Sequence, residues 1–448
     1  QNQLIIAMKN TLFISNKIKK FNKNIFVQGD KSLSIRWALM ASQAIGKSRA
    51  YNLLNSEDVK STLNAIRKLG IKVQKKKNYC EINGQGLNGF SSKNNVTINA
   101  GNSGTLSRLL PGVLVKSKNS IKIVGDKSLS KRDFSRIIKP LSAFGVKILS
   151  KKNKLPLKIK GTDFLRPIEY DELKGSAQVK SCIMLAALNT PGITKIRALR
   201  SRDHTERLFK FLKIPININK QKNIDIIEIN GQFHYKSFNF RIPGDISSCS
   251  AFLVLTLLSK NSEILIKNIN VNKTRTGIID ILKKMNAKIK LKNKRLYNGE
   301  EIADINVKST KYLKAVRNGL SNNSRYIDEL PLIFYACARA KGVSYFKNLG
   351  ELRQKECDRL KFSARLLKMI GIKVIETKDS LKIFGNPNLE LNENYIIKNF
   401  DKDHRACILS CIVALTLGGR WKIHDADSIN TSFPNFLSIL KSLGAKIN

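Results

Sequence analysis

Two kinds of helix alternate along the chain, and they differ in how their apolar residues are spaced. In the segment 56–69 apolar side chains recur every three or four residues behind a serine, which predicts an amphipathic helix with a serine cap. The segment 182–188 is apolar on all sides, as is typical of a buried helix. Short β-branched runs at 96–98 and 121–124 predict strands between such helices. The pattern therefore predicts an α/β protein.

A recurring turn closes the amphipathic helices. At Leu69-Gly70-Ile-Lys-Val73 a helix ends in glycine and passes into a strand, and glycine readily adopts the left-handed backbone needed there. Further turns of this kind, at intervals of about 70 to 85 residues, are centred on Gly145, Lys213, Asn286, Gly371 and Gly444. Lys213 is neither glycine nor asparagine, so the third turn is the least regular. These turns predict six repeated α+β units.

Each unit also carries one of the strongly apolar helices. Their first residues are expected near Ser32, Gly104, Ser176, Ser247, Asp328 and Asp403. Six units divide naturally into two domains of three, and Arg241-Ile-Pro-Gly-Asp245 is the expected crossover, because it reopens a pattern of glycine, aspartate and serine. We expect one domain at 29–241, with repeats one to three, and a second at 1–28 plus 242–448, with repeats four to six.

Buried helices that begin with small polar residues favour anions at their starts. The first N–H groups of a helix have no partner within it, and the helix dipole makes this end positive. If the helix starts converge on a cleft between the domains, that cleft attracts phosphate and carboxylate groups.

One phrase occurs twice, as Gly29-Asp-Lys-Ser-Leu-Ser-Ile-Arg36 and as Gly125-Asp-Lys-Ser-Leu-Ser-Lys-Arg132. Each copy places a lysine and an arginine five residues apart, beside small hydroxyl residues. The repetition indicates a duplicated unit, and the basic and hydroxyl groups indicate that it holds an anion.

Composition adds a competing interpretation. The 448 residues include 81 Lys and Arg against 33 Asp and Glu, which gives a formal charge of +48 and suggests nucleic acid or another anionic surface. The alternative is a solvated surface in a chain rich in lysine, asparagine and isoleucine. We favour this alternative because the lysines are spread over the whole chain and form no separate basic tail.

Cysteine and histidine usage argues against disulfides and metals. The seven cysteines form no Cys-x-x-Cys pair, and the four histidines have no metal-ligand spacing. We therefore expect core cysteines in a reducing compartment and no metal. No apolar stretch has the length of a membrane span, and the one within residues 1–8 is too short for a secretory signal. The expected location is the cytoplasm.

Eight short motifs follow one another in order, with one or two in each repeat. They are Gly29-Asp-Lys-Ser-Leu-Ser-Ile-Arg36, Asn99-Ala-Gly-Asn-Ser-Gly-Thr105, Ser176-Ala-Gln-Val-Lys-Ser181, Ser201-Arg-Asp-His-Thr-Glu206, Thr274-Arg-Thr-Gly277, Ile327-Asp-Glu-Leu-Pro331, Glu351-Leu-Arg-Gln-Lys-Glu-Cys-Asp-Arg359 and Asp403-His-Arg405. Through them the chain resembles the 5-enolpyruvylshikimate-3-phosphate synthases, or 3-phosphoshikimate 1-carboxyvinyltransferases, over nearly its whole length. The third and fourth motifs are similar to the class II subgroup.

The resemblance implies a fold and a reaction. The fold is the two-domain enolpyruvyl transferase fold, with six βαβαββ-like repeats, three per domain around a pseudo-threefold axis, and an active site in the interdomain cleft that closes on substrate. The reaction transfers the enolpyruvyl group of phosphoenolpyruvate to the 5-hydroxyl of shikimate 3-phosphate and releases phosphate without metal or cofactor. It belongs to the shikimate pathway to chorismate and the aromatic amino acids. We expect a monomer that binds these two small molecules, with no nucleic acid and no membrane partner.

Motif by motif, the resemblance also implies the substrate contacts. Both substrates carry phosphate and carboxylate groups, so several cations are needed, and arginine offers a planar fork for such groups. Shikimate 3-phosphate is expected to contact Lys31, Ser32, Arg36, Ser176, Ala177, Gln178, Arg202, Asp328 and Lys355. Phosphoenolpyruvate is expected to contact Lys31, Gly104, Arg132, Gln178, Arg359 and Arg405.

Three residues are expected to carry the chemistry. Asp328 takes the proton of the 5-hydroxyl, and Glu356 gives a proton to the methylene carbon of phosphoenolpyruvate. Lys31 stabilises the developing charge. Because nearby cations lower the pKa of a carboxyl group, Glu356 must be partly desolvated to act as an acid.

Simpler structural readings compete with these assignments. Ser32, Ser176 and Asp328 can be helix caps alone, and the segment 355–359 can form an exposed salt-bridged face. Departures from the family pattern also bear on single sites. Asp133 could draw Arg132 into a local ion pair, Cys357 replaces a usual serine, and Thr431 stands where class I members have a lysine.

The nearest rival activity is transfer of enolpyruvate to UDP-N-acetylglucosamine on the same fold. The sister enzyme needs an asparagine beside its N-terminal lysine and usually a loop cysteine as acid. Here Lys31 is followed by Ser32, and no cysteine lies in a comparable loop. A basic nucleic-acid-binding protein is the more distant alternative.

Overall fold

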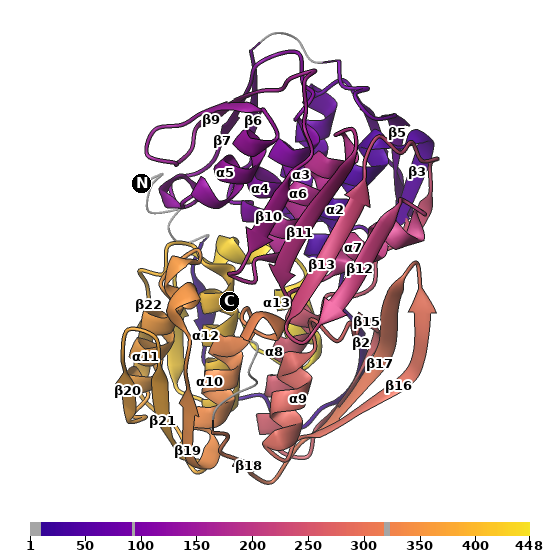
Figure 1. Ribbon diagram of the computed structural model, residues 1–448. Helices are drawn as coiled ribbons and strands as arrows, with labels where there is room; N and C mark the ends of the chain where they lie inside the picture. The colour runs from indigo at the N-terminus through magenta and orange to yellow at the C-terminus, as the bar shows by residue number, and fades with distance from the viewer. Residues whose placement is uncertain (1–9, 92–94, 318–322) are drawn as a thin grey trace, which may run out of the picture. The chain divides into compact units, whose positions relative to one another are not determined.

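The computed structural model divides the chain into two compact units (Figure 1) and describes residues 10–91, 95–317 and 323–448. The first unit, called the central unit below, consists of residues 29–243 and 296–300. The second, called the composite unit, consists of residues 1–28, 244–295 and 301–448. The segment 1–8, on which the secretory-signal expectation rests, lies outside the described residues.

The central unit contains three four-stranded sheets in the part of the chain that the structure describes. In strand order, the first is β14 (Asn239–Arg241), β3 (Ile45–Tyr51), β5 (Tyr79–Gln85) and β4 (Lys72–Lys75). The second is β6 (Val96–Asn99), β7 (Ile121–Val124), β9 (Leu157–Lys160) and β8 (Lys147–Leu149). The third is β10 (Glu169–Glu172), β11 (Ile193–Leu199), β13 (Ile224–Asn230) and β12 (Ile216–Gln221).

The composite unit also has three sheets among its described residues. The first is β2 (Asn22–Phe26), β15 (Glu263–Asn270), β17 (Glu300–Lys308) and β16 (Lys288–Tyr297). The second is β18 (Leu313–Lys314), β19 (Ala340–Phe346), β21 (Leu381–Gly385) and β20 (Val374–Glu376). The third is β22 (Asn394–Ile397), β23 (Arg420–Ile423) and β1 (Leu12–Ile14), beside which Ile447 forms a single bridge to Ile14.

All six sheets repeat one pairing pattern. In each, the first two strands named above are parallel and the third is antiparallel to the second. Two sheets take their first strand from a distant part of the chain, because β14 pairs with β3 and β2 pairs with β15. The repeated pattern confirms the prediction of six related α+β units.

A strongly apolar helix belongs to each repeat, and these helices fill the cores. They are α2 (Lys31–Gln43), α4 (Gly104–Val113), α6 (Ala177–Leu188), α8 (Ile246–Leu258), α10 (Leu330–Ala338) and α12 (His404–Leu417). The first three contribute to the hydrophobic core of the central unit and the last three to that of the composite unit. Their starts fall within two residues of the predicted positions.

A more polar helix follows each apolar one in sequence. These helices are α3 (Glu57–Lys68), α5 (Ser135–Ala143), α7 (His204–Phe211), α9 (Gly277–Lys284), α11 (Arg359–Met369) and α13 (Phe436–Ser442). Short 3₁₀ helices span Leu129–Lys131, Asn323–Arg325, Gly350–Gln354 and Ala426–Thr431.

The predicted turns all adopt the left-handed backbone. The φ angles are +86° at Gly70, +104° at Gly145, +58° at Lys213, +73° at Asn286, +85° at Gly371 and +99° at Gly444. Lys213 therefore closes α7 as glycine closes the others, although a lysine is strained in this conformation. The sixfold turn prediction is confirmed, including its least regular member.

Aspartates, more than serines, cap the apolar helices. Asp30 Oδ1 accepts from the backbone N–H of Leu33 at 2.9 Å, so the first copy of the duplicated phrase caps α2 with Asp30 and not with Ser32. Asp126 makes the same contact to Leu129 at 2.7 Å in the second copy. Ser176 does cap α6, as its hydroxyl accepts from Val179 N at 3.4 Å.

The segment 296–300, the tip of the β16–β17 hairpin, belongs to the central unit, which the predicted boundaries did not include. Within that unit, Glu300 Oε1 lies 2.7 Å from His204 Nδ1, and both side chains are buried. Arg207 Nη1 donates to the carbonyl of Gly299 at 3.2 Å. His204 therefore has a structural partner.

Two further expectations concern the chain as a whole. The seven cysteines are free thiols and all are buried, as predicted for core residues. Burial raises the pKa of Cys80 to about 11 and that of Cys182 to about 12. Among the described helices, none has the length and apolar character needed to cross a membrane.

Candidate active site

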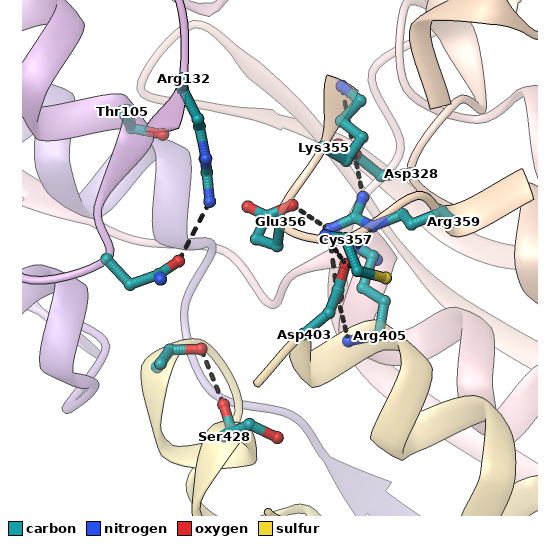
Figure 2. A network of polar contacts seen from close by, with 12 residues as sticks. Thr105, Arg132, Asp328, Lys355, Glu356, Cys357, Arg359, Asp403, Arg405 and Ser428 are labelled. Atoms are coloured by element: carbon teal, nitrogen blue, oxygen red, sulfur yellow. Dashed lines mark hydrogen bonds and ion pairs between the residues drawn. The ribbon is translucent and has the colours of Figure 1, made fainter. Parts of the chain in front are cut away.

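A buried arginine, Arg359, is the centre of a polar cluster in the composite unit (Figure 2). Its side chain is 3% exposed. Its Nε donates to Asp403 Oδ2 at 2.7 Å and its Nη1 to Asp328 Oδ1 at 3.1 Å. Its Nη2 contacts Glu356 Oε2 and lies 3.3 Å from Asp403 Oδ1. Three carboxylates therefore surround one guanidinium.

Helix starts place these groups. Arg359 is the first residue of α11, and Asp358 caps that helix by accepting from Lys361 N at 2.9 Å. Asp403 caps α12, since its Oδ1 accepts from Arg405 N at 2.9 Å while its Oδ2 binds Arg359. One carboxylate thus fixes two helix starts at once.

The charges in this cluster keep one another ionised. Burial lowers the pKa of Arg359, but Asp403, Glu356 and Asp328 outweigh burial and raise it well above its ordinary value. Burial also raises the pKa of Asp403, and the Arg359 guanidinium outweighs this and holds the pKa below its usual range. Loss of one partner would leave a buried charge without compensation.

Two further cations lie at the edge of the cluster. Lys355 Nζ is 3.8 Å from Asp328 Oδ1, and Arg405 Nη1 is 3.9 Å from the buried Glu329 Oε1. The side chains of Lys355 and Arg405 are 23% and 15% exposed. Because these contacts are long and the side chains are partly accessible, both cations can bind an anion.

The simpler readings of this region are wrong for two residues. Arg359 is buried, so the segment 355–359 is not a solvated salt-bridged face. Asp328 pairs with Arg359 and Lys355, whereas Glu329 occupies the N-cap position of α10. Glu356 fulfils the condition of partial desolvation, since its side chain is 15% exposed.

Cys357, which replaces a usual serine, also belongs to the cluster. Its Sγ lies 3.4 Å from Asp403 Oδ2 and can donate to it. Burial, followed by the charge of Asp403, raises the pKa of Cys357 far above its ordinary value. The thiol therefore stays protonated and serves Asp403 as a hydroxyl would.

The candidate residues of the central unit form a second group. Lys31 opens α2, and its Nζ lies 3.0 Å from Asp58 Oδ2, with side chains 18% and 6% exposed. Asp58 lies in the first turn of α3. The carboxylate therefore orients the lysine and leaves part of it accessible.

Arg36 is almost fully buried and connects three helix starts. Its Nε donates to Thr205 Oγ1 at 2.9 Å and its Nη2 to Ser181 Oγ at 2.9 Å. Its Nη1 donates to the carbonyl of Ser32 at 3.2 Å. These contacts tie α2 to α6 and α7, which carry other candidate residues.

Gly104 leaves space for two guanidinium groups. A Cβ atom at this position would lie 2.8 Å from Nη1 of both Arg108 and Arg132. Arg132 Nη2 donates to Asn102 Oδ1 at 3.2 Å (Figure 2). The neighbouring Asp133 accepts from Ser135 N at 3.2 Å, which is a local turn contact.

Gln178 connects α6 to α4 within this group. Its Oε1 accepts from Arg108 Nη1 at 3.2 Å, and its Nε2 donates to Thr105 Oγ1 at 3.2 Å. Ala177 and Arg202, the remaining candidates, are partly buried at or just before the starts of α6 and α7. All candidate residues of the central unit thus lie at or near helix starts, or close to Gly104.

Sequence reasoning missed three residues that hold the candidates in place. Arg108 lies one helical turn after Gly104, and this spacing could have indicated it. Thr205 lies inside a recognised motif, but its hydroxyl is used by Arg36. Asp58 carries no local signal, because its contact with Lys31 depends on the packing of α2 against α3.

Thr431, expected to mark a class difference, lies in the composite unit and donates to the carbonyl of Ser428 at 2.8 Å (Figure 2). No group of three or more histidine, cysteine, aspartate or glutamate side chains suited to a metal ion occurs within residues 10–91, 95–317 and 323–448.

Solved structures place this chain among proteins with the enolpyruvyl transferase fold. The enolpyruvyl transferase NikO from Streptomyces tendae is 15% identical and matches with a TM-score of 0.77 over 98% of each chain, which shows the fold. The EPSP synthase from Acinetobacter baumannii is 33% identical, with a TM-score of 0.85 over 98% of this chain and 99% of that one. The predicted fold class is confirmed.

Sequence relatives narrow the class to a family. The family described as EPSP synthase (3-phosphoshikimate 1-carboxyvinyltransferase) matches residues 15–440. A 3-phosphoshikimate 1-carboxyvinyltransferase of Ruthia magnifica subsp. Calyptogena magnifica is 40% identical over 94% of this chain and 95% of its own. That of Vesicomyosocius okutanii subsp. Calyptogena okutanii is 38% identical over 97% and 98%. The chain belongs to the EPSP synthase family, as the motifs predicted.

Proposed function

We propose that this protein transfers the enolpyruvyl group of phosphoenolpyruvate to the 5-hydroxyl of shikimate 3-phosphate, with release of phosphate. A bond forms between the 5-oxygen and carbon 2 of phosphoenolpyruvate, the bond from that carbon to the phosphate oxygen breaks, and the hydroxyl proton leaves with phosphate. The observation that carries the proposal is the Arg359 cluster, which unites Asp328 and Glu356 on one buried guanidinium. The reaction serves the shikimate pathway.

The cations of the Arg359 cluster and those among the candidate residues of the central unit would bind the two substrates. Shikimate 3-phosphate would contact the nine residues predicted for it, chiefly Lys31, Ser176 and Arg202 at the helix starts of the central unit. Phosphoenolpyruvate would be held by Arg132, Arg359 and Arg405, with Lys31 and Gln178 at its phosphate and Gly104 leaving it room. Arginine suits these roles because its fork binds a carboxylate or phosphate through two hydrogen bonds.

Asp328 would accept the proton of the 5-hydroxyl, and Lys31 would stabilise the charge that develops on the departing phosphate. Glu356 would protonate the methylene carbon as the 5-oxygen adds to carbon 2. It would take a proton back from the resulting methyl group as the bond from carbon 2 to the phosphate oxygen breaks, which restores the enol double bond. Its carboxylate contacts Arg359 in the absence of substrate, so the anion of phosphoenolpyruvate would replace this contact before Glu356 acts on the methylene carbon.

The proposal also covers the oligomeric state, the location and the partners of the enzyme. We infer a monomer in the cytoplasm that acts on two small molecules, with no nucleic acid and no membrane partner. In the proposed reaction, both proton transfers and all charge stabilisation come from side chains.

A phosphate-release assay tests the proposal against its rival. Phosphoenolpyruvate is supplied with shikimate 3-phosphate in one reaction and with UDP-N-acetylglucosamine in another. Phosphate release with shikimate 3-phosphate alone supports the proposal. Release with the sugar nucleotide alone would assign the chain the rival activity.

A further inference from the structure

A buried cluster of charges lies behind the starts of α6 and α7 in the central unit. Lys180 is the fourth residue of α6, and its Nζ lies 2.5 Å from Oε1 of Glu206, the third residue of α7. Their side chains are 0% and 5% exposed. Neither residue belongs to the substrate contacts predicted above.

Glu172 extends this cluster to the loop that precedes α6. It is the last residue of β10, it is buried, and its Oε2 accepts from Ser176 N at 2.8 Å. Burial raises the pKa of Glu172, while the N–H groups of Ser176 and Lys174 and the charge of Lys180 act in the opposite direction. Lys180 therefore lies within the electrostatic reach of two carboxylates.

Burial of the Lys180 ammonium group at this position destabilises the fold unless a carboxylate compensates its charge. A cation in the first turns of a helix faces the positive end of the helix dipole, and a fully buried ammonium group loses its hydration. Glu206 in turn has an oxygen, Oε2, that is buried without a hydrogen-bond partner among the described residues. Each charge thus depends on the other, and the pair joins α6 to α7 rigidly.

A second contact between α6 and α7 involves the residues next to the ion pair. Ser181 follows Lys180 and Thr205 precedes Glu206, and their hydroxyl oxygens are 2.7 Å apart. Both hydroxyl groups accept from Arg36 on α2. The starts of three helices are therefore held by two buried cations, Arg36 and Lys180.

We propose that Lys180 and Glu206 are positioning residues for the shikimate 3-phosphate site. This inference rests on the proposed function. The pair sets the spacing between Ser176, which caps α6, and Arg202 just before α7, and so aligns their polar groups for one ligand. Lys180 itself is buried and touches no substrate.

The test compares Lys180→Met and Glu206→Gln with the wild-type enzyme. Both variants should fold, and the KM for shikimate 3-phosphate should rise by about 10- to 100-fold, because misplaced contacts weaken binding by such factors. The KM for phosphoenolpyruvate and kcat at saturation should stay within about threefold, because Arg359 and Arg405 lie in the composite unit and Lys31 and Arg132 lie outside α6 and α7.

Two further variants separate positioning from general stability. The charge-reversed double variant Lys180→Glu with Glu206→Lys should restore part of the affinity lost in the single variants. Arg197→Met removes an exposed ion pair with Asp171, which joins β11 to β10. The two side chains are 50% and 54% exposed, so this variant should leave both KM values unchanged.

An unchanged KM for shikimate 3-phosphate in folded Lys180→Met and Glu206→Gln overturns the inference, as does an equal rise in both KM values. A wild-type protein that releases no phosphate from the two substrates overturns the proposed function instead. If Lys180→Met fails to fold, Glu206→Gln decides, together with the shift in melting temperature that shikimate 3-phosphate gives each protein. A shift equal to that of the wild type then contradicts positioning.

Discussion

At the scale of single residues, the proposed chemistry centres on an arginine whose charge is neutralised by three carboxylates in the absence of substrate. Arg359 is bound by Asp403 at its Nε and by Asp328 and Glu356 at its outer nitrogens. Asp403 is fully buried and fixes the guanidinium, whereas Asp328 and Glu356 are partly exposed. The two accessible carboxylates are therefore the ones free to exchange for substrate groups.

We predict that Glu356→Gln and Asp328→Asn each fold normally and lose turnover. Removal of a general acid or base costs about 10²- to 10⁴-fold in rate, and the amides keep the size of the carboxyl groups. The rate of phosphate release at saturating concentrations of both substrates measures kcat. The matched control is Glu390→Gln, an exposed carboxylate paired with Lys17 in the same unit, which should keep the wild-type rate. Wild-type turnover in either site variant would remove its assigned role.

Asp403→Asn should destabilise the protein by about 3 kcal/mol at pH 7, the order found when a buried ion pair loses one partner. Burial raises the pKa of Asp403, but Arg359 lowers it more, so the folded pKa lies below the unfolded one. The stability from the ionised form is therefore complete above about pH 5 and is lost as the pH falls below about 4. Urea unfolding at pH 7, 5, 4 and 3 measures the difference, which should shrink at the lower values. A difference that is independent of pH would contradict this ion pair.

The motifs predict the candidate site residues, but they do not predict the residues that contact them. Lys31, Glu356 and Arg359 were predicted because their motifs are contiguous in the sequence. Arg108 and Asp58 escaped prediction, since their contacts arise where separate helices pack together. Short motifs record which side chains are needed, whereas tertiary packing decides what orients them.

At the scale of the elements, the turns show how strongly the fold imposes a backbone shape. Five of the six turn positions are glycine or asparagine, and Lys213 adopts the same left-handed conformation with φ +58°. Side chains other than glycine lose about 1 to 2 kcal/mol there, because Cβ approaches the following carbonyl oxygen.

Lys213→Gly should therefore raise the free energy of unfolding by about 1 kcal/mol, since glycine relieves the strain but adds freedom to the unfolded chain. The exposed lysine side chain contributes little packing that could be lost. Gly371→Ala is the matched control, because φ is +85° and no atom lies within 4 Å of the added Cβ. It should destabilise by about 1 kcal/mol. Chemical denaturation of both variants measures these shifts, and a loss of stability in Lys213→Gly would contradict the strain.

Helix starts were predictable to within two residues, and strand order was not. Small polar residues and aspartates announce a helix start through local hydrogen bonds, as Asp30 and Ser176 do. The pairing of β14 with β3, and of β2 with β15, joins residues 190 and 241 positions apart, which no local pattern encodes.

At the scale of the whole molecule, the charge of +48 needs an explanation that fits a small-molecule enzyme. The lysines are distributed over both units, whereas the cations at the candidate site are mostly paired with carboxylates or polar side chains. The charge is therefore a property of the surface and not of the site.

We predict that double-stranded DNA does not inhibit phosphate release at about 150 mM salt, because nonspecific binding by surface lysines weakens steeply as salt increases. DNA binding at about 50 mM salt should fall by at least tenfold at about 200 mM. Fluorescence anisotropy with a short duplex measures this, beside the enzyme assay. Tight binding that persists at about 200 mM salt, with inhibition, would favour a nucleic-acid role.

The repeats predict two domains of three units, because six similar turns and six apolar helices bury their faces in similar ways. They do not predict that the hairpin tip at 296–300 belongs to the central unit, where Glu300 and His204 form a buried pair. Nothing in its sequence distinguishes it from an exposed hairpin end.

Identification of the product tests the central claim most directly. The protein is incubated with equimolar phosphoenolpyruvate and shikimate 3-phosphate, and the reaction is followed by phosphorus and proton NMR. We expect one phosphate released for each phosphoenolpyruvate consumed, a retained 3-phosphate, and an enolpyruvyl ether on the 5-oxygen of the shikimate ring. Phosphate release without that ether, or no consumption of either substrate by folded protein, would contradict this claim.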